Sequence, residues 1–294
     1  MSACRFPAQL AIVGLGLIGG SLALATRCAR PDVRIIGVDE AAALQHALGR
    51  KAIDVGYEPA RLKQAVRQAD LVILAAPISS ILKLLEVVPC SMKGGAILTD
   101  VGSTKRHISQ VAKEHVPATI SFIGGHPLTG SEKGGFKHAS AHLFQGAGYA
   151  LCPALGSNAA FEKLSVFLAE LGAEIVIVDP DEHDRVLAFT SHLPQLVAVG
   201  LADLVLRRTH PKFCGPGFAG MTRIASSPFA IWGDVFSTNA RNVTLALDEF
   251  IEELQRLRGA IGRGELRAAF ERAQRLLQDG KRGEQPFAPT DRKS

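Results

Sequence analysis

Short, continuous apolar runs recur along the chain up to residue 178, separated by segments long enough to form a helix. Because these runs do not alternate apolar with polar residues, they are typical of strands covered on both faces, as in a parallel sheet. Repeated strand–helix–strand units predict an α/β fold with a doubly wound, Rossmann-type sheet. The expected strands are residues 10–13, 34–38, 69–76, 96–99, 120–123, 147–151 and 174–178.

The pattern changes after residue 178, where helical spacing replaces the apolar runs. Apolar residues from Val186 to Leu204 fall three or four positions apart, which predicts a helix. A Gly/Pro-rich loop follows at 212–220, and further helices are expected at 231–258 and 266–278. We therefore expect an α/β domain at 1–178, an all-helical domain at 179–280 and a disordered tail at 281–294. The apolar helices favour a homodimer over packing within one chain.

Composition limits the classes of partner. The chain has 33 Lys and Arg against 28 Asp and Glu, a net charge of +5, but its basic residues are scattered and no basic run is interleaved with aromatics. We therefore expect no nucleic-acid partner, and the charge suits acidic small molecules instead. Five widely spaced cysteines without a C-x-x-C pair favour reduced thiols in a cytoplasmic protein. No apolar run reaches the roughly 20 residues of a membrane helix, so no membrane partner is expected.

A glycine-rich motif, G-x-G-x-x-G, directly follows the first expected strand and opens a helix. In this context it is the fingerprint of dinucleotide binding: Gly14 permits the tight turn, Gly16 lets the backbone approach the pyrophosphate, and Gly19 lets helix and strand pack closely. Leu17 and Ile18 complete the turn at the helix N-terminus, which favours phosphate binding. A plain glycine-rich turn is the less favoured alternative.

Asp39 ends the second expected strand, 20 residues after Gly19. A carboxylate at this position accepts hydrogen bonds from the ribose hydroxyls and repels a 2′-phosphate. Glu40 adds a second negative charge, and residues 41–43 offer no Arg to neutralise one. The sequence therefore predicts NAD as the cofactor in preference to NADP.

Two loops that follow later strands are candidates for the chemistry, because ligands of open α/β sheets bind where the strands end. One is D-V-G-S-T-K, residues 100–105, and the other is G-G-H-P-L-T-G-S-E-K-G-G, residues 124–135. The second loop places His126 directly after a strand, framed by glycines and fixed by Pro127. Such a His can take a proton from a substrate hydroxyl as a hydride leaves, with an unperturbed pKa near 6.5. A His that only caps a turn is the alternative.

These motifs, together with D-E-H-D-R-V, S-H-L-P-Q and M-T-R-I-A-S-S-P, resemble the prephenate/arogenate dehydrogenases of tyrosine biosynthesis, in the same order and over about residues 11–250. The resemblance implies NAD-dependent oxidative decarboxylation of prephenate to 4-hydroxyphenylpyruvate, with arogenate as a second candidate substrate. It also implies a Rossmann-type domain followed by a helical dimerisation domain.

The resemblance assigns roles to four residues. His126 corresponds to the catalytic hydrogen-bond acceptor for the ring hydroxyl, and Ser103 to the residue that orients it and touches cofactor and substrate. His192 corresponds to a residue of the substrate pocket, and Arg223 to the residue that binds a substrate carboxylate.

Some positions depart from the pattern or have a plainer interpretation. Ala219-Gly220 stand where the family has a polar pair, and Gln195 stands where a second His often occurs, which leaves substrate preference open. His183 follows two acids and is interpreted as a solvated residue in a first helical turn. Trp232 is interpreted as a core residue. His138 and His142 share helical spacing without a third ligand, so no metal site is expected.

Two other functions stay open at this point. One is another two-domain NAD(P)-dependent hydroxyacid dehydrogenase or imine reductase, which would use a Lys-centred site and lack the G-G-H-P and S-H-L-P motifs. The other is a NAD-sensing protein without catalysis, which would leave His126 and Arg223 without a role.

Overall fold

The computed structural model describes residues 6–130, 133–155, 158–261 and 263–281. The chain divides into two compact units between Val243 and Thr244. The expected boundary at 178/179 thus falls inside the first compact unit, and it stays a prediction for the domain organisation. The expected tail at 281–294 lies, from residue 282, outside the described residues.

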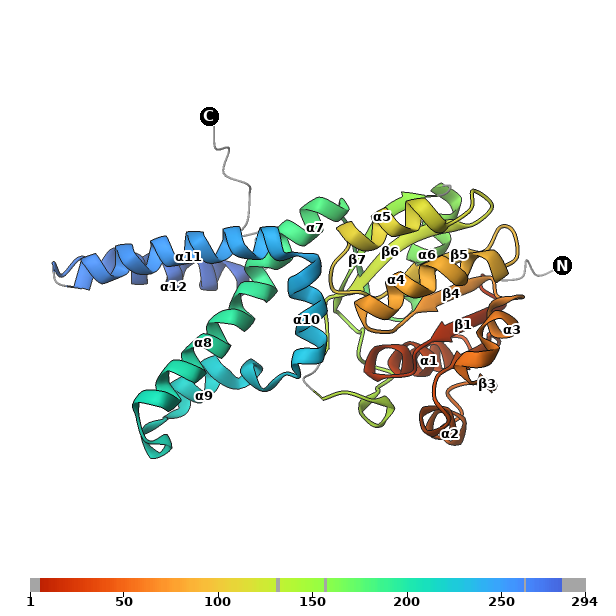
Figure 1. The fold of residues 1–294 in the computed structure, drawn as a ribbon, viewed down its shortest axis with the longest axis horizontal. Helices are drawn as coiled ribbons and strands as arrows, with labels where there is room; N and C mark the ends of the chain where they lie inside the picture. Colours follow the sequence, from red (N-terminus) through yellow and green to blue (C-terminus); the bar gives the residue numbers. More distant parts are fainter. Residues whose placement is uncertain (1–5, 131–132, 156–157, 262, 282–294) are drawn as a thin grey trace. The chain divides into compact units, whose positions relative to one another are not determined.

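The first unit is built on an eight-stranded sheet in the order β3-β2-β1-β4-β5-β6-β7-β8 (Figure 1). The strands are β1 (Gln9–Val13), β2 (Arg34–Val38), β3 (Val55–Tyr57), β4 (Leu71–Leu74), β5 (Ile97–Asp100), β6 (Ser121–Pro127), β7 (Gly148–Leu155) and β8 (Glu174–Ile177). The predicted Rossmann-type α/β fold is confirmed. Because β1 lies between β2 and β4, the order reverses there, which creates the crevice where ligands of such sheets bind.

Two strands differ from expectation. β7 pairs antiparallel with β6, whereas every other neighbouring pair is parallel. Two consecutive parallel strands need a crossover connection, usually a helix, that brings the chain back to the end of the sheet at which the first strand began. The described part of the connection between Pro127 and Gly148 contains only one 3-10 turn, η3 (Phe136–His138). The chain therefore enters β7 at the end of the sheet where β6 finishes, and β7 runs in the opposite direction. β3 was not predicted, since it has only three residues and all are half-buried.

Helices cover both faces of the sheet. They are α1 (Leu17–Ala29), α2 (Ala41–Gly49), α3 (Leu62–Val66), α4 (Ile78–Val87), α5 (Arg106–His115) and α6 (Asn158–Glu170), with 3-10 turns η1 (Pro59–Arg61) and η2 (Pro89–Ser91). One buried cluster joins the sheet to α1, α2 and α6, and a second joins it to α3, α4 and α5. In Figure 1, α4 and α5 lie over β4 to β6. The strands β1, β2, β4, β5 and β6 are mostly buried on both faces, which explains their continuous apolar sequences, whereas β8 at the edge of the sheet is largely exposed.

A helical region follows β8. It comprises α7 (Pro180–Leu187), a π turn η4 (Ala188–His192), α8 (Leu193–Arg208), η5 (Pro211–Phe213), α9 (Pro216–Thr222), η6 (Arg223–Ser226), α10 (Phe229–Thr238), α11 (Ala240–Ile261) and α12 (Arg267–Lys281). The expected helical segment at 231–258 is divided at Asn239, and the expected loop at 212–220 contains most of η5 and most of α9. The second unit holds the rest of α11, beyond Val243, and α12.

The helical run Pro180–Arg208 is long and apolar enough, by length and composition alone, to cross a membrane. This differs from the expectation that no run would meet that test. Polar residues such as Ser191, His192 and Gln195 interrupt the apolar sequence. Three of its side chains, His183, Asp184 and His192, hydrogen-bond within the folded chain, as described below.

Candidate active site

The glycine-rich turn joins β1 to α1. Gly14 has φ +97°, and a Cβ there would lie 2.2 Å from the carbonyl oxygen of Ala75. A Cβ on Gly19 would lie 1.9 Å from the carbonyl oxygen of Gly14, so neither position accepts a side chain. Gly16, in contrast, has no heavy atom within 4 Å of its Cβ position, which leaves open space in front of the backbone.

The first turn of α1 supplies the electrostatics of an anion site. Gly16 is the N-cap and provides no capping side chain, and the helix continues through Leu17 and Ile18. The first N–H groups of a helix have no partner within the helix and carry partial positive charge, so they favour a phosphate. The open space at Gly16 therefore fits a pyrophosphate group.

Asp39 lies directly after β2. Its carboxylate accepts the backbone N–H of Leu15 at 2.5 Å and that of Glu40 at 2.7 Å. These two bonds fix the side chain beside the glycine-rich turn. A carboxylate has about four acceptor positions, so capacity for ribose hydroxyls remains.

One cavity of about 630 Å³ brings together the four other predicted residues, Ser103, His126, His192 and Arg223. They come from the loop after β5, from β6, from the π turn η4 and from η6. The volume suits a small organic ligand. His126 was expected just after a strand; it lies within β6, near its end and opposite Ala150 of β7.

Behind His126 lies a chain of buried polar groups. Nδ1 of His126 is 2.9 Å from Nε2 of His183, and Nδ1 of His183 is 2.8 Å from Oδ1 of Asp184. His183 and Asp184 are 1% and 0% exposed. The interpretation of His183 as a solvated residue is therefore wrong: α7 packs against α5 and encloses it, although Asp181 and Glu182 do occupy the first turn of α7 as expected.

Asp184 also anchors the start of α5. Its carboxylate accepts the backbone N–H of Lys105 at 2.7 Å and that of Arg106 at 3.0 Å. The positive end of the α5 dipole favours the ionised carboxylate there. The loop that carries Ser103 is thus fastened to the helix that carries His183.

Lys105 and Asp100 form a fully buried ion pair beneath the site. Lys105 Nζ also donates to the carbonyl oxygen of Gly125 at 2.7 Å, and Asp100 accepts the N–H of Gly102 at 2.8 Å. A buried charge is tolerated when it is paired and hydrogen-bonded in this way. The pair ties the loop after β5 to the residue that precedes His126.

His192 is held from another side. Asn239, 4% exposed at the break between α10 and α11, places its Nδ2 2.7 Å from the carbonyl oxygen of Asp184 and 3.2 Å from Nδ1 of His192. Trp232 meets the His192 ring edge-on, with ring centroids 6.2 Å apart. Trp232 packs against the second core cluster, as expected, and also lines the cavity.

Burial favours the neutral form of both cavity histidines. It lowers the pKa of His126 well below 6.5, and the nearby His183, Lys105 and His192 lower it further. Burial also lowers the pKa of His192 to about 4, against an opposing effect of Asp184. The unperturbed pKa near 6.5 expected for His126 from the sequence is therefore wrong for this environment, because desolvation disfavours the charged ring.

Arg223 begins η6 and is exposed at the cavity. Gln195 donates through Nε2 to the carbonyl oxygen of Ile224 at 3.1 Å and so holds this segment against α8. Ala219 and Gly220 lie in α9, just before it. Gln195, which stands where related sequences often have a second His, thus supports the segment that carries Arg223.

The sequence did not predict three residues of this network as site residues: His183, Asp184 and Asn239. His183 and Asp184 lie in a polar run that also reads as a helix start, and Asn239 lies between two helices without a motif. Only the packing of α7 and α10 against the sheet domain shows that they are buried.

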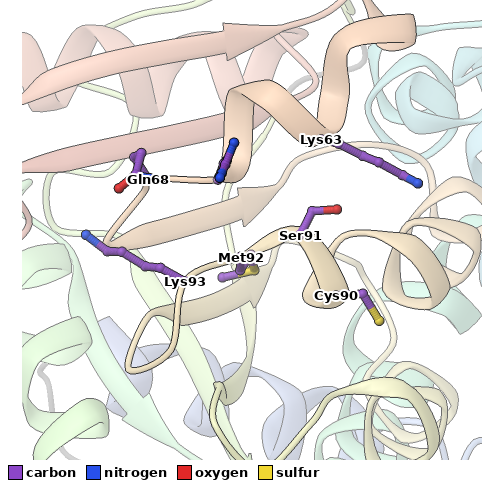
Figure 2. Close-up of a pocket in the computed structure, with 7 residues that line it drawn as sticks. Lys63, Gln68, Cys90, Ser91, Met92 and Lys93 are labelled. Carbon is purple, nitrogen blue, oxygen red and sulfur yellow. The ribbon is translucent and has the colours of Figure 1, made fainter.

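A second cavity, of about 440 Å³, lies elsewhere on the sheet domain (Figure 2). It is lined by residues of α3, η2 and the segments that follow them, among them Lys63, Gln68, Cys90 and Lys93. Lys93 pairs with Asp70 at 2.5 Å. None of the residues predicted for the site lines this cavity.

Comparison with known proteins identifies the family of the chain. Residues 22–177 match the family described as prephenate dehydrogenase, nucleotide-binding domain, and residues 179–275 match prephenate dehydrogenase, dimerization domain. The prephenate dehydrogenase of Bacillus subtilis (strain 168) is 35% identical over 261 residues, which cover 84% of this chain and 68% of that protein.

Two solved structures are similar over almost the whole chain. The Aquifex aeolicus prephenate dehydrogenase, in complex with hydroxyphenyl propionate and NAD+, superposes with a TM-score of 0.86 at 26% identity and covers 95% of this chain and 99% of that one. The Synechocystis arogenate dehydrogenase gives a TM-score of 0.78 at 28% identity, with 93% and 99% covered. Both family matches and the 35% identity lead to one conclusion: this chain belongs to the prephenate dehydrogenase family.

Proposed function

We propose that the chain catalyses the NAD-dependent oxidative decarboxylation of prephenate to 4-hydroxyphenylpyruvate in tyrosine biosynthesis, with arogenate as a second substrate that would give tyrosine. The observation that carries this proposal is the single cavity lined by Ser103, His126, His192 and Arg223. These residues come from four separate segments of the sequence, and a cavity with a neutral base and a cation suits an acidic substrate that loses a proton.

The cofactor is NAD, held by the glycine-rich turn. Gly14, Gly16 and Gly19 shape the turn, Leu17 and Ile18 begin the helix whose N–H groups face the pyrophosphate, and Asp39 accepts the ribose hydroxyls. Ser103 touches both cofactor and substrate. When bound, NAD accepts the hydride from the hydroxyl-bearing carbon.

The substrate is bound through its charge. Prephenate carries two carboxylates, and the guanidinium of Arg223 can grip one of them through two parallel hydrogen bonds. His192, neutral and buried, contributes a polar contact rather than a charge. The apolar cavity residues, Trp232 among them, contact the ring.

His126 moves the proton. It accepts the proton of the ring hydroxyl as the hydride leaves, which requires the neutral ring that burial favours. Carbon dioxide then departs and the ring becomes aromatic. Because aromatisation makes the step strongly downhill, the protein supplies mainly orientation and charge.

The same chain forms a homodimer, and its location is the cytoplasm. Only 22% of the most apolar stretch of Pro180–Arg208 is buried in the single chain, and exposed apolar residues continue along α11 and α12. A second copy would cover such surfaces. The described cysteines, Cys28, Cys90, Cys152 and Cys214, are free thiols, which suits a reducing compartment.

The test is NADH formation from prephenate and from arogenate, with NAD and NADP compared, for the native chain and for Arg223→Ala. Removing one partner of a hydrogen-bonded charge pair that becomes buried on binding costs about 2–5 kcal/mol, so the KM for prephenate should rise roughly 30-fold or more if the bound substrate covers Arg223. Arg223→Lys should restore part of the loss, because it keeps the charge but not the planar fork.

Arg207→Ala is the matched control, since Arg207 is an exposed arginine of α8 paired with Asp203 and is not among the residues lining the cavity. It should leave KM unchanged. Normal prephenate binding by Arg223→Ala would remove Arg223 from the substrate site, and no NADH with either substrate would reject the proposed reaction.

A further inference from the structure

The hydrogen bonds behind His126 fix which of its nitrogens carries the proton. The carboxylate of Asp184 already accepts two backbone N–H groups, and an ionised carboxylate can only accept. Nδ1 of His183, 2.8 Å from Oδ1, is therefore the donor, and Nε2 of a neutral His183 is left as an acceptor. Nδ1 of His126, 2.9 Å from that Nε2, must then donate. This leaves Nε2 of His126 with a free lone pair for the cavity.

The hydrogen bonds of Asn239 give the opposite result for His192. The oxygen of the Asn239 side chain accepts Nδ2 of Asn242 at 2.8 Å, and its NH2 group lies 2.7 Å from the carbonyl oxygen of Asp184, so the amide orientation is determined. The same NH2 group faces Nδ1 of His192 at 3.2 Å. Nδ1 of His192 therefore accepts, and the proton of the neutral ring resides on Nε2.

We infer that Asp184 and Asn239 are positioning residues that hold the two cavity histidines in opposite tautomers, so that Nε2 of His126 accepts and Nε2 of His192 donates a hydrogen bond. The hydrogen bonds that reach His126 through His183 form one arm of this network, and those that reach His192 through Asn239 form the other. Both arms include Asp184, which accepts from His183 through its carboxylate and from Asn239 through its carbonyl oxygen.

The inference rests on the proposed function for its chemical meaning. An acceptor at His126 can take the hydroxyl proton, and a donor at His192 can bind a substrate oxygen. If His192 instead presented a lone pair, it would repel an anionic substrate. The other ionisable groups that act on the two rings are His183 and Asp184 of α7 and Lys105 before α5, and Arg223 of η6 shares the cavity.

The direct test is nitrogen-15 NMR of the histidine side chains in the full chain at about neutral pH, because the two ring nitrogens report the tautomer by their shifts. His126→Asn and His192→Asn identify the signals. We expect the Nδ1–H tautomer for His126 and the Nε2–H tautomer for His192. The same tautomer for both rings, or the reverse assignment, would overturn the inference.

Variants test the role of each arm. Asn239→Asp replaces the donor with an acceptor at nearly constant shape, so His192 should change to the Nδ1–H tautomer and the KM for prephenate should rise roughly 10-fold or more, with kcat less affected. An unchanged His192 tautomer in Asn239→Asp would contradict this arm even if the protein were less stable.

For the other arm, His183→Phe removes the acceptor for His126, and kcat should fall roughly 10-fold or more, as when a histidine base loses the partner that fixes its tautomer. His183→Gln restores an oxygen acceptor and should recover part of the loss. His107→Phe, at an exposed histidine of α5, is the matched control and should leave kcat unchanged. Equal kcat in His183→Phe and the native chain would refute the positioning role.

The tautomer measurement separates this inference from the proposed function. The predicted tautomers without prephenate turnover would reject only the reaction, whereas turnover with other tautomers would reject only the inference.

Discussion

At the scale of a single residue, we propose that Asp39 controls the choice of cofactor. Its carboxylate is held beside the glycine-rich turn by the N–H groups of Leu15 and Glu40. A fixed negative charge there favours ribose hydroxyls and opposes a 2′-phosphate. We therefore expect Asp39→Ala to weaken NAD binding and to improve the use of NADP relative to NAD.

The measurement is the ratio of kcat/KM with NAD to that with NADP, together with the Kd of each cofactor. Asp32→Ala is a control, because Asp32 is an exposed carboxylate before β2 that pairs with Arg30. An unchanged cofactor ratio in Asp39→Ala would argue against the ribose contact.

At the same scale, the site could be predicted from the sequence only in part. Asp39 and His126 follow strands in a recognisable local context, so the residues themselves were sufficient to propose them. Ser103, His192 and Arg223 were proposed because their motifs resemble those of the family. His183 could not be recognised, because its role depends on the burial of α7 against α5, and a polar residue after two acids is more often solvated. Asn239 carries no local pattern at all.

At the scale of elements, the π turn at Ala188–His192 determines where the two histidines of this helical run point. His183 and His192 are nine residues apart, which in a regular α-helix places them on roughly opposite faces. The π turn adds one residue to a turn and reduces that divergence by roughly 100°. Pro194 has no N–H to give to the carbonyl of Thr190, and the N–H of Leu193 bonds to the carbonyl of Ala188, five residues earlier.

Deleting Thr190 should therefore convert the π turn to a regular α-turn and move His192 away from Asn239. We expect helix content by circular dichroism to be preserved and kcat/KM for prephenate to fall at least roughly 10-fold. Thr190→Ala is the control that removes only the side chain, which lines the cavity, without changing the helical register, and it should lose less activity than the deletion. Equal activity in the deletion and in Thr190→Ala would show that the π turn does not position His192.

The elements of the sheet were largely predictable, because strands buried on both faces have uninterrupted apolar sequences. The direction of β7 was not, since an apolar run has the same appearance in either direction. The direction depends on the connection from β6, which lacks a crossover helix in its described part. The break at Asn239 was missed because residues on both sides have helical spacing.

At the scale of the whole molecule, the helical region after residue 178 has two tasks. Its first part, through Asn239, supplies His192, Arg223 and Trp232 to the cavity and His183 to the hydrogen bond behind His126. This explains why the compact units divide at Val243 rather than near residue 179. The sequence showed the change from apolar runs to helical spacing after residue 178. It could not show the contact between His126 and His183, because these residues belong to distant segments and a local pattern does not report such contacts.

We propose association with a second copy of the chain as the second task. Large apolar side chains of α11 and α12 are exposed in the single chain, including Leu254 at 48% and Leu277 at 70%. We expect the intact chain to scatter light as a homodimer and Leu254→Glu to shift it toward the monomer, because a charge in an apolar interface is costly. Glu252→Gln, at an exposed polar position of α11, should stay dimeric. A monomeric native chain would rule out the dimer.

The central claim is that His126 is a buried, neutral base for prephenate oxidation, and the pH profile of kcat/KM tests it most directly. A protonated ring cannot accept the hydroxyl proton, and the lowered pKa means that His126 takes up a proton only well below 6.5. Activity should therefore be constant from about pH 8 down through about pH 6.5 and fall only at lower pH, and His126→Asn should lower kcat by roughly 10²–10⁴ across that range while NAD binding is kept. A fall in activity centred near pH 6.5 or above, or near-normal turnover by His126→Asn, would contradict the account.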